Sequence, residues 1–262
     1  MQPTINVLGI SLKTFGLMFA LAFLAAGAVI ARRMRELGKP VDWAYEMAFA
    51  ALAGGVVGSR LYFLAQHYDE VKHDLIGNLF SGTGLVWYGG AIGGALAVFA
   101  WAAWRRWLGL ELLDLAAAPL ALGYAIGRIG CQVSGDGDYG IASSLPWAMA
   151  YPHGTVPTAL RVHPTPIYET LAMGFVAWWL WRQRDAFRPG VIFAFYLVLS
   201  GIERLLVEFI RRNSEVVAGL TAPQVESIVI IVVGAAWLAS VGRRGGWRPA
   251  GGAARAPRMA RA

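Results

Sequence analysis

Long uninterrupted apolar blocks are the feature that most constrains how this chain can fold. A helix needs about 20 predominantly apolar residues to cross the hydrocarbon core of a bilayer, and several blocks reach or approach that length. They are Ile10–Ile30, Ala44–Leu64, Leu85–Trp104, Leu112–Ile126, Ile167–Trp181, Val191–Ile210 and Val225–Val241. With 57% hydrophobic and 15% charged residues, the chain lies outside the usual range of soluble domains. It is predicted to be an all-α polytopic membrane protein with about seven transmembrane helices.

The distribution of basic residues orients these helices. Lys and Arg concentrate on the cytoplasmic side of membrane proteins, and a basic cluster follows the first block in ARRMRELGK. Because no basic region precedes that block and no cleavage site follows it, we interpret it as an uncleaved helix rather than a signal peptide. Alternating the later blocks places the other basic clusters inside, which predicts an N-out, C-in orientation. The longest connection, residues 128–162 between the fourth and fifth blocks, then lies outside.

A single membrane-embedded domain is predicted over residues 1–242, followed by a basic, disordered tail over residues 243–262. The tail contributes to a formal net charge of +7. An anionic inner leaflet explains this charge without a further partner, so no nucleic acid is expected to bind. The single cysteine, Cys131, excludes an internal disulfide and is interpreted as a small buried residue.

Three arginines lie within or at the edge of the apolar blocks, where an ionisable group requires a partner or a function. Arg60, Arg128 and Arg204 all fall towards the outer face in this topology. Each could snorkel to the interface or pair with a nearby carboxylate. The candidate carboxylates are Glu203, Glu208, Asp114 and Asp136. A shared anion site is favoured, and guanidinium groups suit the phosphate of a phospholipid headgroup because they keep their charge and offer forked donors.

The predicted outer loop and the block ends carry the other polar candidates. Asp136 and Asp138 lack further ligands at calcium-loop spacing, so a turn or pairing with arginine is favoured and no metal is predicted. His163, before the fifth block, is either a structural hydrogen-bonding group or a catalytic one. Tyr88, at the start of the third block, is either an interfacial anchor or part of the site. The glycines that follow Tyr88 predict close packing between helices.

Five short motifs, taken in order, resemble the prolipoprotein diacylglyceryl transferase family of bacterial inner membranes. GRIGCQVSGDGDYG is similar to the family pattern Gly-Arg-x-Gly-Asn-Phe-x-Asn-Gly-Glu, which is followed shortly by Gly. GGVVGSRLYF resembles Gly-Gly-Arg-x-Gly-Tyr, and WYGGAIGG resembles Phe-His-Gly-Gly-Leu-Ile-Gly. VHPTPIYE resembles Arg-His-Pro-Ser-Gln-Leu-Tyr-Glu, and ERLLVEFIR resembles Phe-Arg-x-x-Val-Glu-Phe-Phe-Arg. The resemblance covers the chain from about Phe15 to Gln224.

The resemblance implies an enzyme that moves the diacylglyceryl group of phosphatidylglycerol onto the lipobox cysteine thiol of a prolipoprotein. The products would be a thioether and glycerol phosphate. It also implies a multi-pass protein of the bacterial inner membrane, with its active site facing the outer side, membrane lipids around it and no cofactor. Two alternatives are a related membrane transferase with another acceptor and a non-catalytic phospholipid-binding or transport protein.

The same resemblance assigns roles to individual residues. Arg128 and Arg204 match the family's essential arginines and would hold the lipid phosphate and stabilise the departing glycerol phosphate. Tyr88 stands where the family has histidine, so the thiol base is left open among Tyr88, His163, Asp136 and the arginine field alone. The set assigned to catalysis is Arg128, Arg204, His163 and Tyr88. The set assigned to substrate binding is Arg60, Arg128, Arg204, Asp136, Gly135, Gly140, Tyr168 and Glu208.

Overall fold

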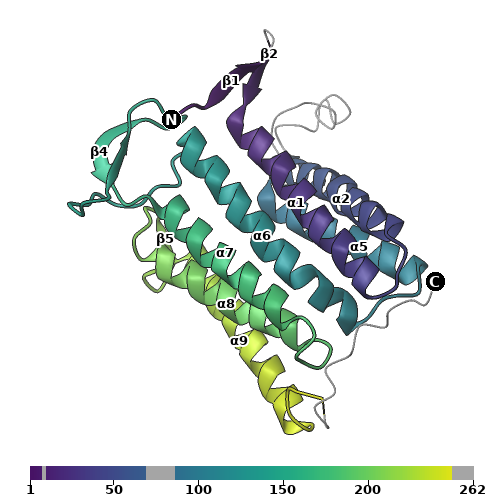
Figure 1. Ribbon diagram of the computed structural model, residues 1–262. Coiled ribbons are helices and arrows are strands. Elements are labelled where there is room, and N and C mark those ends of the chain that lie inside the picture. The colour runs from purple at the N-terminus through teal and green to yellow at the C-terminus, as the bar shows by residue number, and fades with distance from the viewer. Residues whose placement is uncertain (8–9, 69–85, 250–262) are drawn as a thin grey trace. The chain divides into compact units, whose positions relative to one another are not determined.

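The computed structural model describes residues 1–7, 10–68 and 86–249, and it is mostly helical (Figure 1). The helices are α1 (Thr14–Glu36), α2 (Asp42–Gln66), α5 (Trp87–Trp104), α6 (Leu110–Ser134), α7 (Thr165–Gln183), α8 (Val191–Glu208) and α9 (Ala222–Arg243). The strands form three antiparallel hairpins. These are β1 (Thr4–Val7) with β2 (Ile10–Lys13), β3 (Met149–Tyr151) with β4 (Thr158–Val162), and β5 (Glu215–Val217) with β6 (Leu220–Thr221).

Each predicted apolar block overlaps one of these helices, although α1 and α6 extend beyond the ends of their blocks, and Leu85 lies outside the described residues. Among the described helices, α1, α2, α6 and α9 are long and apolar enough to cross a membrane, and α5 is a shorter apolar helix. Helix α8 carries Glu203, Arg204 and Glu208 within its 18 residues. The structure is therefore that of a mostly helical membrane protein. The count of seven spans and their orientation stay predictions.

The first helix starts later than its apolar block predicts. Residues Ile10–Lys13 belong to strand β2, and α1 begins at Thr14. The buried Thr14 hydroxyl donates to the carbonyl oxygens of Gln2 at 2.8 Å and Pro3 at 3.0 Å. These bonds tie the N-terminal hairpin to the start of the helix, a tertiary contact that hydropathy does not encode.

Helix α6 ends later than its apolar block predicts. The block ends at Ile126, but the helix runs to Ser134, so Arg128 is a helical residue rather than the first residue of the outer loop. Gly130 lies inside this helix and packs against α1, where a Cβ would lie 3.1 Å from a side chain of that helix. The stop comes at Gly135, whose φ of +60° lies in the left-handed region that favours glycine.

The chain divides into two compact units, and each is described by itself. The first comprises residues 1–30 and 113 onward, and the second comprises residues 31–112. The predictions of one domain over 1–242 and of a disordered tail stay predictions, and residues 250–262 lie outside the described residues. At the start of that tail, Trp247 donates to the carbonyl oxygen of Leu238 at 2.8 Å.

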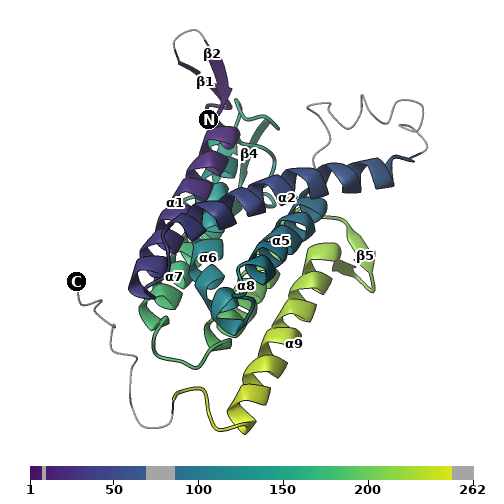
Figure 2. The ribbon, with the colours of Figure 1, turned by 90° about the vertical axis from the view of Figure 1, so that its right-hand side faces the viewer.

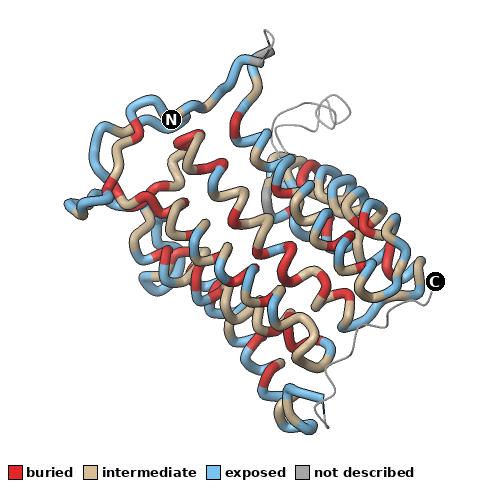
Figure 3. The backbone as a smooth tube through the Cα atoms, in the orientation of Figure 1, coloured by how far each residue is buried: buried red, intermediate tan, exposed pale blue. Residues whose placement is uncertain are grey.

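The core of the first unit lies between α6, α7 and α8. Small alanines on α6 let the larger side chains of α7 approach closely, and buried residues run along α6 in Figure 3. The buried cluster comprises Ala117, Ala118, Ala121, Ala125, Met173, Val176, Ala177, Leu180 and Ile192. Helix α9 packs on α8 through Gly201 and Gly234, where a Cβ would lie 2.7 Å and 2.8 Å from α9 and α8 side chains, respectively.

In the second unit, α2 and α5 lie side by side in both views (Figures 1 and 2). Their contact is built from Gly54 and Gly58 of α2 and Gly89 and Gly93 of α5. A Cβ at Gly93 would overlap the backbone of Gly54 and lie 2.7 Å from the Cα of Gly58. The predicted close packing of helices through these glycines is therefore confirmed.

This contact predicts a selective sensitivity to one added methyl group. Gly93→Ala should lower the stability of the detergent-solubilised protein by about 1–3 kcal/mol, because α2 and α5 must separate to admit the Cβ. Thermal unfolding would show this as a midpoint lower by several degrees. Gly174→Ala is the matched control, because a Cβ at Gly174 of α7 has nothing within 4 Å. Equal midpoints for the two variants would contradict the close contact.

Candidate active site

A fully buried carboxylate, Glu169, lies in the first turns of α7. The helix begins after Pro164, and Pro166 in its first turn has no N–H that would be left unpaired there. The Glu169 side chain has no exposed surface. A buried charge of this kind persists only where opposite charges and hydrogen-bond donors surround it.

Two arginines from different helices contact Glu169. Arg128 of α6 places Nε 3.2 Å from Oε2, and Arg204 of α8 places a terminal nitrogen 3.2 Å from Oε1. Tyr124, one turn before Arg128, donates its hydroxyl to Glu169 Oε1 at 2.9 Å and accepts from Arg128, also at 2.9 Å. The structure thus brings Arg128 and Arg204 together, as the sequence predicts. The sequence did not predict that they would meet on Glu169.

A third arginine completes the cluster, and its part was not predicted either. Arg211 follows the end of α8, and its side chain is 8% exposed. It pairs with Asp138 and lies 3.7 Å from Glu169 and 3.8 Å from Glu208. Arg204, Glu208 and Arg211 follow i, i+4, i+7 spacing, which in the sequence predicts one helical face, although α8 ends at Glu208 and Arg211 reaches the cluster from the segment after it. That spacing is the sequence signal that identifies Arg211.

Glu208 links the cluster to the last helix. Its Oε2 lies 3.0 Å from a terminal nitrogen of Arg204, while Oε1 accepts from Asn213 at 2.6 Å and from Thr221 at 2.8 Å. Thr221 is the N-cap of α9. These contacts hold the end of α8 against the start of α9, and the predicted substrate-binding role of Glu208 stays a prediction.

The carboxylate beside Arg128 is Asp138; the sequence favoured a turn or pairing with arginine for both Asp136 and Asp138 and did not assign these roles between them. Asp138 pairs with both Arg128 and Arg211. Asp136 instead accepts the backbone N–H of Asp138 at 3.3 Å, which is the local turn that aspartate favours. The turn carries Asp138 to the arginines and leaves Asp136 outside their hydrogen bonds, a geometry that one-dimensional spacing does not reveal.

Backbone contacts clamp this loop between two helices. The N–H of Gly140 donates to the carbonyl oxygen of His163 at 2.8 Å, and the N–H of Ile141 donates to that of Ile210 at 2.8 Å. A Cβ on Gly140 would lie 3.0 Å from the Cβ of His163 and would overlap the Ile210 carbonyl. A Cβ on Gly135 would lie 2.7 Å from the Cα of Gly154. The two motif glycines therefore fix the loop, and direct substrate contacts by them stay predictions.

Three cations and three anions make up the cluster. The cations are Arg128, Arg204 and Arg211, and the anions are Asp138, Glu169 and Glu208. Burial of Asp138 raises its pKa, but Arg128 and Arg211 outweigh that effect, and the pKa of this carboxyl lies below its usual range. Asp138 is therefore an anion at neutral pH, and the interior pairing that the sequence left open is present.

His163 and Tyr168 form a separate hydrogen-bonded group beside the clamped loop. His163 Nδ1 lies 3.4 Å from the Tyr168 hydroxyl, which accepts from Trp147 Nε1 at 2.7 Å. No described hydrogen bond joins this group to the three arginines. The structural reading of His163 is thereby supported, and its role as a base stays a prediction.

Arg60 and Tyr88 belong to the second unit. Arg60 is buried in α2, with its guanidinium carbon 5.2 Å from the ring centre of Phe63. Tyr88 lies in the first turn of α5 and is 41% exposed. Their predicted parts in the site stay predictions. Cys131, in α6, is buried as predicted.

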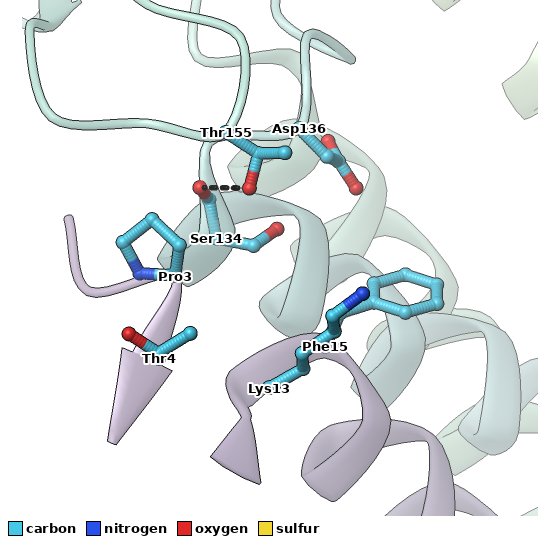
Figure 4. A pocket seen from close by; sticks show the side chains of 7 residues that line it. All are labelled: Pro3, Thr4, Lys13, Phe15, Ser134, Asp136 and Thr155. Atoms are coloured by element: carbon cyan, nitrogen blue, oxygen red, sulfur yellow. Dashed lines mark hydrogen bonds between the residues drawn. The ribbon is translucent and has the colours of Figure 1, made fainter. Parts of the chain in front are cut away.

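A cavity of about 470 Å³ opens beside the motif loop in the first unit (Figure 4). Thr155 donates to the carbonyl oxygen of Ser134 at 3.2 Å across one side of it. The lining residues are Pro3, Thr4, Lys13, Phe15, Ser134, Asp136 and Thr155. The N-terminal hairpin and the motif loop thus line a cavity that Asp136, rather than Asp138, faces.

A cation fits this region poorly. Cys131, Asp136 and Asp138 offer ligand atoms within 4.8 Å of one another. Asp138, however, is already neutralised by Arg128 and Arg211, and a cation would meet their repulsion.

The fold and the site define a class: a helical membrane protein with an arginine–carboxylate cluster buried where α6 and α8 end and α7 begins. The sequence model of the family described as prolipoprotein diacylglyceryl transferase matches residues 3–240. The chain belongs to this family.

Curated relatives agree with the match. The phosphatidylglycerol–prolipoprotein diacylglyceryl transferase of Clostridium tetani is 30% identical over 240 residues, which are 89% of this chain and 95% of the relative. The enzyme of the same name from Leptospira interrogans is 31% identical, over 78% of this chain and 73% of the relative. That from Chromohalobacter salexigens is 32% identical, over 80% of each chain.

The Asp138 contacts predict a pH-dependent stability. Asp138→Asn should lower the free energy of unfolding at pH 7 by about 1–2 kcal/mol, a value reduced for partial exposure of the side chain. Because the folded pKa is depressed, the contribution is complete above the unfolded value of about 4 and is lost as pH falls through the folded value.

Thermal unfolding of the wild type and Asp138→Asn from pH 7 down to pH 3 measures this difference. The gap between them should be constant from pH 7 to pH 5 and should shrink below pH 4. Asp136→Asn is the matched control, because asparagine keeps the side-chain oxygen that accepts the Asp138 N–H. A gap that stays constant to pH 3, or an equal loss in Asp136→Asn, would contradict the assignment.

Proposed function

We propose that this protein transfers the diacylglyceryl group of phosphatidylglycerol to the thiol of a lipobox cysteine in prolipoproteins. The relatives that cover most of the chain carry the name of this transferase. In the reaction, the cysteine sulfur bonds to the glyceryl carbon while the bond from that carbon to the phosphate oxygen breaks. The products are a thioether and glycerol phosphate.

The observation that carries the proposal is the pair of motif arginines on one buried carboxylate. Glu169 fixes the directions of Arg128 and Arg204 before any substrate binds. Donors that are already oriented stabilise developing charge without reorganising. The described ion pairs of Arg204 use its two terminal nitrogens, and a guanidinium has more N–H donors than these contacts use. Donors therefore remain for phosphate oxygens.

In this proposal, Arg128 and Arg204 bind the lipid phosphate and stabilise the charge on the departing glycerol phosphate. Asp138 pairs with Arg128 and Glu208 pairs with Arg204, and these contacts keep the two guanidinium groups in place. Tyr88 and His163 are proposed as further catalytic positions. The remaining positions proposed to bind substrate are Arg60, Gly135, Asp136, Gly140, Tyr168 and Glu208.

We place the protein in the bacterial inner membrane with seven spans, N-out and C-in. Arg182 lies in the last turn of α7 and Arg243 ends α9, and Asp114 near the start of α6 accepts the N–H of Gly190, the residue before α8, at 2.7 Å. The cluster lies at the opposite helix ends, near Arg128 and Glu208. Because basic residues favour the cytoplasmic side, the cluster would face the outer side.

The orientation is testable by labelling single cysteines in a Cys131→Ser background. A cysteine at Ser144, in the loop after α6, should react with a membrane-impermeant maleimide in intact spheroplasts. A cysteine at Pro189, between α7 and α8, should react only after permeabilisation. The reverse pattern would overturn the orientation.

The transferase activity itself predicts a mass gain on a thiol. Purified protein in detergent, given phosphatidylglycerol and a lipobox peptide, should add a diacylglyceryl mass to the peptide and none to the same peptide with cysteine replaced by serine. Lipid consumption without peptide modification would indicate another acceptor. Bound, intact lipid would indicate a non-catalytic lipid-binding protein.

The arginines are tested best by variants that keep their charge. Arg128→Lys and Arg204→Lys should each reduce the transfer rate by at least about a hundredfold, because lysine cannot reproduce the oriented fork. Alanine would also leave Glu169 as an uncompensated buried charge, which confounds activity with folding. Arg32→Lys, at a largely exposed ion pair of α1, is the control. Near-normal transfer by Arg128→Lys would refute its role.

A further inference from the structure

One carboxyl group beside the cluster has no partner. Glu203 precedes Arg204 on α8, is 8% exposed, and its Oε1 is buried. Among the described residues, no hydrogen bond or ion pair involves this side chain. By contrast, Asp138, Glu169 and Glu208 each contact at least two donors. An unpaired buried carboxyl costs stability, so its presence calls for a function.

The charged and titratable groups near Glu203 belong to α6, α7, α8 and the segment after α8. Within its electrostatic range lie Glu169 of α7, Tyr124 and Arg128 of α6, Arg204 of its own helix, and Arg211 after that helix. Helix α9 also packs on α8. The carboxylate that α9 carries, Glu226, is exposed. Glu203 therefore shares its surroundings with one other buried carboxylate, Glu169.

Two neighbouring buried carboxyl groups repel each other when both are charged, so the one with less compensation binds a proton more tightly and, when ionised, is the stronger proton acceptor. Glu169 is held as the anion by Tyr124, Arg128 and Arg204. Protonating Glu169 would weaken those contacts, whereas Glu203 can gain or lose a proton without breaking any described ion pair. Of the four carboxyl groups in this region, Glu203 is the one whose protonation can change during a reaction at least cost.

We propose that Glu203 is the proton acceptor for the thiol of the incoming cysteine, an inference that rests on the proposed transferase function. The thiol proton passes to the Glu203 carboxylate as sulfur bonds to the glyceryl carbon. The electron pair of the breaking carbon–oxygen bond leaves with glycerol phosphate, beside Arg128 and Arg204. Glu203 then releases its proton to water or to the departing phosphate, which restores the carboxylate.

The sequence itself fits this assignment. In ERLLVEFIR, Glu203 stands where the family motif has phenylalanine, and in WYGGAIGG, Tyr88 stands where that motif has histidine. A tyrosine with a reference pKa of about 10 is a poor base at neutral pH. His163 directs Nδ1 towards Tyr168 and has no described contact with the arginines. A carboxyl group thus occurs beside the cluster in a chain that has tyrosine in place of the motif histidine.

The test compares Glu203→Gln with the wild type in the peptide transfer assay. Glutamine keeps the size of the side chain but cannot accept the proton. We expect kcat at pH 7 to fall about a hundredfold or more, with KM for lipid and peptide within about threefold. The defect should shrink by about tenfold between pH 7 and pH 9.5, because a thiol with a pKa near 8.5 then ionises by itself.

Each outcome decides between distinct conclusions. No transfer by the wild type would refute the proposed function itself. Wild-type transfer with Glu203→Gln within threefold of it would refute this inference alone, and so would a large loss that does not change with pH, because that indicates a structural role. If Glu203→Gln fails to fold, Glu203→Asp and Glu203→Phe replace it, and the expected order of rates at pH 7 is Glu, Asp, then Phe. Glu226→Gln, at the exposed carboxyl of α9, should match the wild type.

Discussion

The site depends on the burial of one charge, the carboxylate of Glu169. Moving a carboxylate out of water costs several kcal/mol unless the surrounding groups compensate it. The compensation comes from Arg128 and Tyr124 of α6 and from Arg204 of α8. Three helices of the first unit are therefore joined at one point by charge as well as by packing. Loss of any partner would leave a charge inside the protein.

A second constraint comes from the two tasks that the proposed function gives these arginines, which are to balance Glu169 and to bind phosphate. A guanidinium that only balanced Glu169 could lie in any orientation, but here Asp138 and Glu208 fix the remaining directions. The loop that presents Asp138 is itself held by backbone hydrogen bonds to both neighbouring helix ends. Such rigidity suits the proposed role in stabilising charge on a departing phosphate, because the donors need no rearrangement. The glycine-rich motif contributes through the loop that it shapes.

Family membership and physical chemistry agree on the reaction class but not on every residue. The chain keeps the arginines of the family motifs and departs at Tyr88 and at Glu203. One departure removes an imidazole, and the other adds an unpaired carboxyl group beside the arginines. A proton acceptor need not be conserved in type for the chemistry to persist, provided that another group with a free proton site lies close to the reacting thiol.

Sequence by itself determined the helical membrane class, the approximate position of each helix and the convergence of Arg128 and Arg204. Apolar blocks, basic clusters and motif order are one-dimensional signals, and each has a direct physical meaning. Sequence did not reveal that α6 continues through Arg128, that Asp138 rather than Asp136 pairs with it, or that Glu169, Tyr124 and Arg211 complete the cluster. Only the tertiary structure decided these points, because a buried charge chooses its partners among residues far apart in the chain, and turn geometry decides which of two nearby carboxylates reaches it.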